Sequence, residues 1–408
     1  MTSWPLLLFS LILSLQAFLV SRFDKRVQRR RAEKERWQKT QKNHWPAAEV
    51  ILCIRGADPT LHEMLKALSH QNYLGDWRLQ IVVDSTSDPS WRVIEGLTTS
   101  TSTIHSYSPT WKEMNFQPLI ETPKQGSLKC ASLLQAFKYL HPSSEIIAVV
   151  DADAVVKADW LGSLVEACCQ PGIGAVSGNR WFIPSKGTLL GWTRAVWNAG
   201  AVVLMTLLDI PWGGSLAVRR EVVDEGTWRA LLSHGLCEDT GLLGPLKRLG
   251  LRYQFRPELF IVDHHDEVTL PQLSSWITRQ LLTARLHHPT WPLVALHGIG
   301  STTLLLAGLI KGAWTALTIY EIGCVGLLIW IERIAMEREA LSIQWWAIAL
   351  IPGQLLNGFA TIAASVVKTV EWRDVVYRVT KRPRGVAIIS SPTLNVSELT
   401  STDSNSYG

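Results

Sequence analysis

Charged residues are scarce in this chain of 408 residues, where Asp, Glu, Lys and Arg supply only 18%, against about 25% in typical soluble proteins. Hydrophobic residues supply 47%, which is too large a share for an intrinsically disordered chain. Internal repeats and CxxC spacings are absent, and the six cysteines are scattered. These absences argue against a disulfide scaffold and a structural zinc site, so we expect reduced, intracellular thiols.

The net excess of positive charge comes from a single block. Residues 21–43 hold ten Lys and Arg against three acidic residues, while the whole chain has a net charge of +5, so the remainder is slightly acidic. A basic block is often an arm that binds nucleic acid. This one directly follows an uncharged apolar run, residues 4–20, which favours a place beside a membrane, and we expect no nucleic-acid partner.

The apolar run at the N-terminus is long enough to cross a bilayer, which takes about 17–25 residues. Its positive charges follow it, whereas those of a cleaved signal peptide come first. The positive-inside rule then keeps the next domain in the cytoplasm. We therefore predict a transmembrane anchor over residues 1–21 and a basic juxtamembrane linker over residues 22–46. The nineteen tryptophans fit a protein at membrane–water interfaces.

Three more apolar runs follow near the C-terminus, residues 292–310, 313–331 and 343–367, and each can span a bilayer. They predict two or three transmembrane or interface helices within residues 291–370, and with the anchor a multi-pass integral membrane protein. Four full crossings would carry the basic residues that follow to the outside, against the positive-inside rule. We therefore expect one segment, with the run that contains Pro352 as the candidate, to be re-entrant or interfacial.

Two further stretches complete the division of the chain. Residues 195–212 are apolar but interrupted by Asn198 and Asp209, which fits either an interfacial helix or a buried core helix. Residues 371–408 are basic at first and rich in Ser and Thr near the end. We therefore predict a basic and then disordered tail over this range.

Short apolar strands alternate with amphipathic helices between residues 47 and 290. The expected strands are residues 49–54, 79–83 and 145–150, and the expected helices are residues 60–70 and 128–140. Such alternation predicts an α/β domain with a mostly parallel sheet and helices on its faces. Ligands bind such sheets beyond the carboxyl ends of the strands.

Two carboxylates follow the last of these strands directly. Asp151 and Asp153 come after four apolar residues, and their side chains point to the same side because strand periodicity is two. Hard oxygen ligands suit Mg²⁺ or Mn²⁺, and Mg²⁺ usually combines one or two carboxylates with substrate phosphates. A lone DxD also occurs in turns and helix caps, but its place after a buried strand favours a metal and nucleotide site.

Two more charged residues occupy comparable positions. Asp84 ends the second strand, where its carboxylate could accept a hydrogen bond from a base or ribose, or form an Asx turn. Lys129 begins a helix, and an ammonium there could face a phosphate. The alternative for Lys129 is a solvated surface lysine.

Candidate groups for acid–base chemistry lie further along the chain. Glu238 and Asp239 follow the small-residue loop Trp212-Gly213-Gly214-Ser215 and stand at an expected helix start. One of them could remove a proton from an acceptor hydroxyl, or both could merely complement the helix dipole. Arg279 could offset the charge of a departing diphosphate, or anchor the chain beside the membrane.

In this order the residues resemble those of family 2 inverting glycosyltransferases of the GT-A fold. More narrowly, the chain resembles ceramide glucosyltransferases and their bacterial lipid-glycosylating relatives over about residues 49–378. The opening Arg55-Gly56-Ala57-Asp58-Pro59 and the tail Glu371-Trp372-Arg373 with Tyr377-Arg378 belong to the same resemblance. It implies a GT-A domain, with a Rossmann-like, mostly parallel sheet, over residues 47–290.

The resemblance also implies a role for each candidate residue. The nucleotide-sugar site would hold Asp84 at the base, Asp151 at the ribose region, and Arg55 and Lys129. The metal would bind Asp153, the acceptor loop would be Trp212, Gly213 and Gly214, and the catalytic group would be Asp239 with Glu238 and Arg279. The family's Gln or Arg, two residues, then Arg-Trp becomes Trp276-Ile-Thr-Arg279-Gln280, which disfavours processive polymer synthesis.

The sequence therefore predicts a membrane-bound glycosyltransferase with its catalytic domain in the cytoplasm. We expect it to move a hexose, with glucose from UDP-glucose as the first choice, onto the hydroxyl of a ceramide-like lipid or diacylglycerol, with Mg²⁺ or Mn²⁺. The alternatives are a processive polysaccharide synthase, a polyprenyl-phosphate glycosyltransferase and a degenerate nucleotide-binding membrane scaffold. His264 and His265 either supply a third metal ligand or belong to a polar loop that binds no metal.

Overall fold

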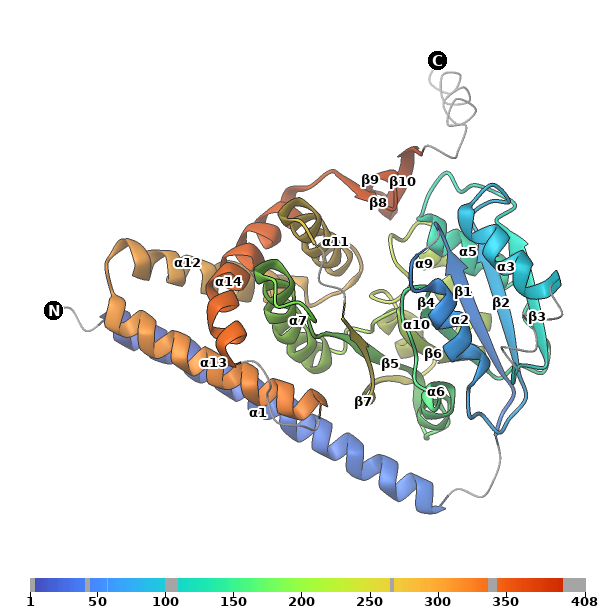
Figure 1. Ribbon diagram of the computed structural model, residues 1–408, viewed down its shortest axis with the longest axis horizontal. Coiled ribbons are helices and arrows are strands. Elements are labelled where there is room, and N and C mark those ends of the chain that lie inside the picture. Colours follow the sequence, from blue (N-terminus) through green and yellow to red (C-terminus); the bar gives the residue numbers. More distant parts are fainter. Residues whose placement is uncertain are drawn as a thin grey trace. The chain divides into compact units, whose positions relative to one another are not determined.

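The structure, a computed structural model, describes residues 4–40, 45–56, 58–99, 109–264, 268–336 and 343–391. The chain divides into two compact units (Figure 1). The helical unit comprises Met1–Thr40, Asn179–Ile210 and Phe255–Val366, and the sheet unit comprises Gln41–Gly178, Pro211–Gln254 and Val367–Gly408. Each unit is thus assembled from three separate stretches of chain.

The main sheet has seven strands in the order β3-β2-β1-β4-β6-β5-β7. The strands are β1 Ala48–Ile54, β2 Trp77–Val83, β3 Glu113–Pro118, β4 Ile146–Asp151, β5 Ile173–Phe182, β6 Ser215–Arg219 and β7 Arg252–Asp263. The neighbours β3, β2, β1 and β4 are parallel, and β6 is antiparallel to both β4 and β5. The expected mostly parallel α/β sheet is confirmed.

Helices of the sheet unit connect these strands. They are α2 Leu61–Ser69, α3 Pro89–Thr99, α5 Leu128–Ala136, α6 Trp160–Cys168, α8 Arg220–Asp224, α9 Thr227–Leu232 and α10 Leu243–Arg248. Strands β1, β2 and β4 are buried along almost their whole length, as central parallel strands covered on both faces must be. Their apolar runs, interrupted by Glu49 in β1 and by Arg78 and Gln80 in β2, are the reason that the sequence predicts them.

The register of the central strands brings their carboxyl ends together. Ile54 pairs with Val83, and Cys53 pairs with Asp151. The residues that follow β1 and β2, Arg55 and Asp84, therefore lie at the same edge of the sheet as Asp151. This edge is where the sequence analysis expects the ligand.

A second, three-stranded antiparallel sheet lies near the C-terminus, in the order β10-β9-β8. Its strands are β8 Thr369–Trp372, β9 Val375–Lys381 and β10 Arg384–Ser390. The prediction of a basic tail from residue 371 missed this sheet, although Val375 and Tyr377 are buried and alternate with less buried positions. The part of that tail expected to be disordered, residues 392–408, lies outside the described residues.

The helical unit contains the long apolar helices. Its helices are α1 Trp4–Thr40, α7 Leu189–Leu208, α11 Leu270–His287, α12 Trp291–Ile310, α13 Trp314–Met336 and α14 Ile343–Val366. Among the described residues, four helices, α1, α12, α13 and α14, are long and apolar enough to cross a membrane. This matches the expected one N-terminal and up to three C-terminal segments. Helix α14 continues through Pro352, which membrane helices tolerate.

Helix α1 extends well beyond its apolar run. Its 37 residues make a helix of about 55 Å, whereas the hydrocarbon core of a bilayer is about 30 Å thick. The basic linker expected after the anchor is therefore the second half of the same helix up to residue 40, and residues 41–44 lie outside the described part. Arg26 pairs with Asp209, and Lys34 Nζ lies 3.6 Å from Glu258 Oε1, so contacts within the helical unit hold this half.

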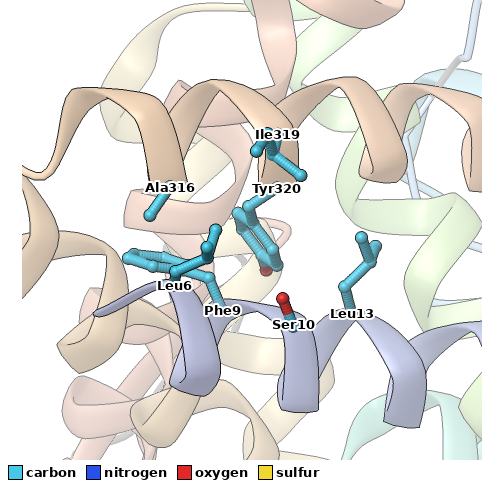
Figure 2. Close-up of a pocket in the computed structure, with 7 residues that line it drawn as sticks. All are labelled: Leu6, Phe9, Ser10, Leu13, Ala316, Ile319 and Tyr320. Atoms are coloured by element: carbon cyan, nitrogen blue, oxygen red, sulfur yellow. The ribbon is translucent and has the colours of Figure 1, made fainter. Parts of the chain in front are cut away.

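Packing in the helical unit relies on glycine where helices meet. Phe9, Leu13 and Tyr320 line a small cavity between α1 and α13 (Figure 2). A Cβ at Gly323 would overlap the side chain of Leu13, so a larger residue at this position would push α1 away. Such small residues allow the close helix approach that is common in membranes. In α7, Ala199 is fully buried, which favours the buried-helix interpretation of residues 195–212.

Candidate active site

Lys129 joins two carboxylates at the carboxyl edge of the sheet. Ser127 caps helix α5, since its Oγ accepts a hydrogen bond from the backbone N–H of Cys130. Lys129 Nζ, two residues after the cap, lies 2.5 Å from Asp151 Oδ1 and 2.6 Å from Glu238 Oε1. Only 2% of the Glu238 side chain is exposed, so this is a desolvated network in which one ammonium balances two carboxylates.

Burial dominates the electrostatics of this network. It raises the pKa of Glu238 to about 6, while the Lys129 ammonium opposes the shift and the charges of Asp239 and Asp151 add to it. Burial alone would lower the pKa of Lys129, but Asp151 and Glu238 outweigh it and keep that pKa well above its ordinary value. The lysine is therefore a fixed positive charge, and Glu238 titrates closer to neutrality than an exposed glutamate does.

Asp239 is held by backbone donors, and no lysine in the described part of the chain pairs with it. Its Oδ2 accepts a hydrogen bond of 2.7 Å from Gly213 N–H, and its Oδ1 accepts one of 2.5 Å from Thr240 N–H. The indole N–H of Trp228 donates to the carbonyl of Glu238 at 2.8 Å and fixes the backbone before Asp239. The expected helix start at Glu238 is wrong, because residues 238–242 form bends and turns and α10 begins only at Leu243.

The Gly213-Gly214 loop fits closely around these carboxylates. A Cβ at Gly213 would overlap Oε1 of Glu238, and a Cβ at Gly214 would overlap the Trp212 ring and lie 2.5 Å from Asp151 Oδ2. The carbonyl of Gly214 also accepts the backbone N–H of Asp151 at 3.2 Å. Glycine is required at both positions because no side chain has room there.

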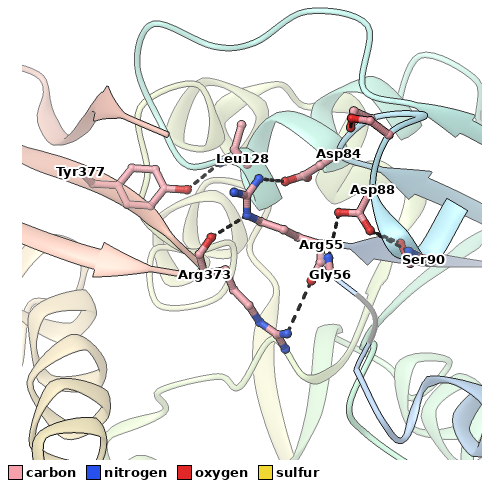
Figure 3. A network of polar contacts seen from close by, with 10 residues as sticks. Arg55, Gly56, Asp84, Asp88, Ser90, Leu128, Arg373 and Tyr377 are labelled. Carbon is pink, nitrogen blue, oxygen red and sulfur yellow. Dashed lines mark hydrogen bonds and ion pairs between the residues drawn. The ribbon is translucent and has the colours of Figure 1, made fainter. Parts of the chain in front are cut away.

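Asp84 forms an ion pair with Arg55 at the same edge. Arg55 Nη1 donates to Asp84 Oδ2 at 2.7 Å, and the exposed fraction of the Asp84 side chain is 9%. Burial raises the pKa of Asp84, and the hydrogen bond and charge of Arg55 counteract the shift. Arg55 Nε donates to the carbonyl oxygen of Arg373 at 2.6 Å (Figure 3), so the C-terminal sheet contributes to this site.

Asp88 is a site residue that sequence reasoning missed. Its Oδ2 accepts the backbone N–H of Gly56 at 2.9 Å, and its Oδ1 accepts the backbone N–H of Ser90 at 2.9 Å (Figure 3). It thereby connects the segment after β1 to the start of α3. The sequence Asp88-Pro89 carries a signal for this, since an N-cap residue followed by proline is typical of a helix start.

The carboxylates at this edge of the sheet suit a metal ion that arrives with a substrate. Asp153 lies in the turn after β4 and is partly exposed. Within the described ranges, no group of three or more His, Cys, Asp and Glu could hold a metal ion. A magnesium ion bound by one or two carboxylates and by substrate phosphates fits this edge of the sheet, whereas a cage made only of protein ligands does not.

Two other predicted residues belong to the helical unit. Arg279 lies on α11 in the helical unit, so its assignment stays a prediction. His264 is exposed, and its Nδ1 lies 3.0 Å from the carbonyl oxygen of Ile183. His265 lies outside the described residues.

The family model described as glycosyl transferase family 21 matches residues 8–384. Among solved structures, a mannosyltransferase from Pyrobaculum calidifontis in complex with GDP-Man and Mn²⁺ is 15% identical, with a TM-score of 0.46 over 86% of this chain and 98% of that one. Glucosyl-3-phosphoglycerate synthase from Mycobacterium tuberculosis, in complex with Mg²⁺ and UDP, is 15% identical, with a TM-score of 0.36 over 62% and 79%. No curated protein matches the sequence.

The family match covers nearly the whole chain, from the apolar half of α1 to the start of β10. It confirms the expected glycosyltransferase, under the number 21 where the sequence analysis expected family 2. The chain belongs to glycosyl transferase family 21.

Proposed function

We propose that this glycosyltransferase moves a hexose from a UDP-sugar to the hydroxyl of a membrane lipid, with inversion at the anomeric carbon. The observation that carries the proposal is the gathering of Asp151, Glu238 and Asp239 around one lysine and one glycine loop. Inversion in one displacement needs a single carboxylate as base. Asp239 suits this role because two backbone N–H groups orient its carboxylate, whereas Lys129 pairs with Asp151 and Glu238.

The transfer is a single displacement. Asp239 removes the proton of the lipid hydroxyl while that oxygen attacks the anomeric carbon, and the bond from this carbon to the diphosphate breaks. Hydrogen bonds from Gly213 and Thr240 keep the carboxylate of Asp239 oriented during the attack. Lys129 contacts both Glu238 and Asp151, and these ion pairs keep the glycine loop and the carboxylate of Asp151, which faces the ribose, in place. The acceptor hydroxyl would lie beside Trp212.

The donor binds at the edge formed by β1, β2 and β4. Asp84, held by Arg55, accepts a hydrogen bond from the base, and Asp151 contacts the ribose. Asp153 would hold the Mg²⁺ or Mn²⁺ ion with the diphosphate, and such an ion offsets negative charge on the leaving group. Arg279 has the same task in this proposal, because a guanidinium binds phosphate oxygens in a bidentate manner.

The proposal of a lipid acceptor is based on the apolar helices. Four helices of suitable length and composition suit an enzyme whose acceptor is insoluble in water. The basic block after the first apolar run favours a catalytic domain in the cytoplasm by the positive-inside rule. We therefore propose that the acceptor enters from the cytoplasmic leaflet.

Membranes that contain the protein test the proposed reaction. We expect incubation with UDP-glucose and Mn²⁺ to yield a lipid heavier by one hexose in mass spectrometry, and EDTA to suppress it by more than about tenfold, because metal ions offset several kcal/mol of developing charge. UDP-galactose and GDP-mannose serve as competing donors. A polymer, a glycosylated polyprenyl phosphate or full activity in EDTA would contradict the proposal.

The glycine loop yields a second prediction. Gly213→Ala places a methyl group against Oε1 of Glu238, so the carboxylates must shift, and a misplacement of about 1 Å costs about 10²-fold in rate. Gly244→Ala in α10 is the matched control, because a Cβ there meets nothing within 4 Å. Initial rates of lipid glycosylation should fall only for the first variant. Equal rates for both would show that the loop does not position the carboxylates.

A further inference from the structure

The C-terminal sheet docks onto two segments beside the proposed donor residues. The backbone N–H of Gly126 donates to the carbonyl of Val386 at 2.8 Å, and the N–H of Val386 donates to the carbonyl of His234 at 2.9 Å. In β9, Tyr377 Oη accepts the backbone N–H of Leu128 at 3.4 Å (Figure 3). Tyr377 and Val386 are buried. The sheet is therefore an integral part of the sheet unit, attached at the start of helix α5.

Glycine permits this docking in β10. A Cβ at Gly385 would overlap the carbonyl oxygen of His234, so any other residue would push β10 away from that segment. Arg384, the neighbouring residue, is exposed. Glycine at position 385 is therefore required for docking, while Arg384, the residue before it, can be changed freely.

The turn between β8 and β9 has an unusual backbone. Arg373 has a φ of 50° and Asp374 a φ of 62°, although two-residue turns with positive φ at both positions strongly prefer Asn-Gly. Residues other than glycine in this region cost free energy and persist where the surrounding structure holds them. Here the turn is held by Arg55 Nε, which donates to the carbonyl of Arg373, and by an ion pair of 3.6 Å between Arg373 and Asp58.

Arg55 connects this turn to Asp84. Its Nε donates to the Arg373 carbonyl and its Nη1 donates to Asp84 Oδ2 (Figure 3). A long arginine side chain loses much rotamer freedom when it is fixed. The two acceptors, the carbonyl of Arg373 and the carboxylate of Asp84, fix the guanidinium of Arg55. Oδ1 of Asp84 accepts no hydrogen bond from the described residues. The turn thus fixes the guanidinium of Arg55, and this guanidinium orients the carboxylate of Asp84. The second oxygen of that carboxylate is available to a ligand.

We propose that the β8–β9 turn is a positioning element of the donor site, and that it sets the affinity for the nucleoside diphosphate through Arg55 and Asp84. The inference rests on the proposed function in one respect, that Asp84 contacts the base. The catalytic carboxylate, Asp239, is held by separate hydrogen bonds from Gly213 and Thr240. Disturbing the turn should therefore weaken donor binding and leave kcat nearly unchanged.

Two substitutions at one exposed position provide the test. Asp374→Pro removes the positive φ, because proline fixes φ near −65° and also forces the preceding Arg373 into an extended conformation. Asp374→Gly keeps the turn, because glycine adopts positive φ readily. The probe is UDP with MnCl₂, titrated by calorimetry into the full chain in detergent. We expect Asp374→Pro to raise the Kd for UDP about tenfold through loss of a charge-assisted hydrogen bond, and Asp374→Gly to keep the parental value.

A second pair of substitutions, in β10, controls for a local effect of proline in the turn. Gly385→Val, which displaces β10, should also raise the Kd for UDP and the KM for the donor about tenfold, while Arg384→Val should not. The kcat and the KM for the lipid should stay within about twofold in folded variants. Thermal unfolding identifies any variant that does not fold.

Each outcome decides between the inference and the proposed function. Parental UDP affinity in folded Asp374→Pro and Gly385→Val would overturn the positioning role, as would a fall in kcat at unchanged affinity. If UDP binding weakens as expected but the parent makes no glycolipid, the inference holds and the proposed lipid transfer fails. If the parent does not bind UDP, both fail.

Discussion

Asp239→Asn should lower the kcat of lipid glycosylation by about 10²- to 10⁴-fold, the usual contribution of a general base. The amide oxygen of asparagine can still accept one of the two backbone N–H groups that Asp239 accepts, from Gly213 and Thr240, so the loop should largely keep its shape. The amide cannot take up the hydroxyl proton. The KM for the donor should therefore change little, since the substitution removes an interaction that acts in the transition state.

Steady-state rates with saturating UDP-sugar measure this effect. Asp224→Asn is the matched control, because Asp224 ends α8 in the same unit with half of its side chain exposed and an ion pair to Arg220. It should keep the parental kcat. Transfer by Asp239→Asn at more than a tenth of the parental rate would remove Asp239 as the base.

Lys129→Met should produce the largest loss of stability in the sheet unit. It leaves Glu238 and Asp151 without their shared cation, and an uncompensated buried charge costs about 3–5 kcal/mol. The volume of the side chain is nearly kept, so the cost is electrostatic. Thermal unfolding of the full chain, followed by tryptophan fluorescence, should show a lower midpoint than in the parent at pH 8.

The pH dependence distinguishes this electrostatic cost from lost packing. Burial already raises the pKa of Glu238 to about 6, and removal of the ammonium raises it further. The folded variant then binds a proton that the unfolded chain releases, so its stability falls as pH rises through this pKa. We therefore expect a smaller difference from the parent at pH 5 than at pH 8, and partial recovery in Lys129→Met with Glu238→Gln. A loss independent of pH would contradict the charge network.

The sequence predicted the central sheet and the apolar helices because their signals are local. Strands β1, β2 and β4 are rich in apolar residues, and the polar residues at the ends of β2 and β4, Asp84 and Asp151, lie at one edge because the strands are parallel and in register. The lengths of α12, α13 and α14 follow directly from long apolar runs, although Glu321 interrupts the run of α13. Periodicity and strand direction alone determine these features.

Long-range contacts could not be predicted in the same way. Arg55 and Arg373 are separated by 318 positions in the chain, and no local pattern shows that a C-terminal turn meets the end of β1. The alternating residues around Tyr377 do indicate a strand, but not its partner. Lys129 was expected to face a phosphate or solvent, and its position between two carboxylates depends on how α5, β4 and the loop at Glu238 fold together.

The anomeric configuration of the lipid product distinguishes transfer with inversion from transfer with retention. UDP-glucose carries an α-linked sugar, and a single displacement promoted by Asp239 inverts that centre. We expect a β-glucoside, recognised in the proton NMR spectrum of the purified glycolipid by a large coupling between H1 and H2. An α-glucoside, formed with retention, would contradict attack by an acceptor oxygen that one carboxylate activates.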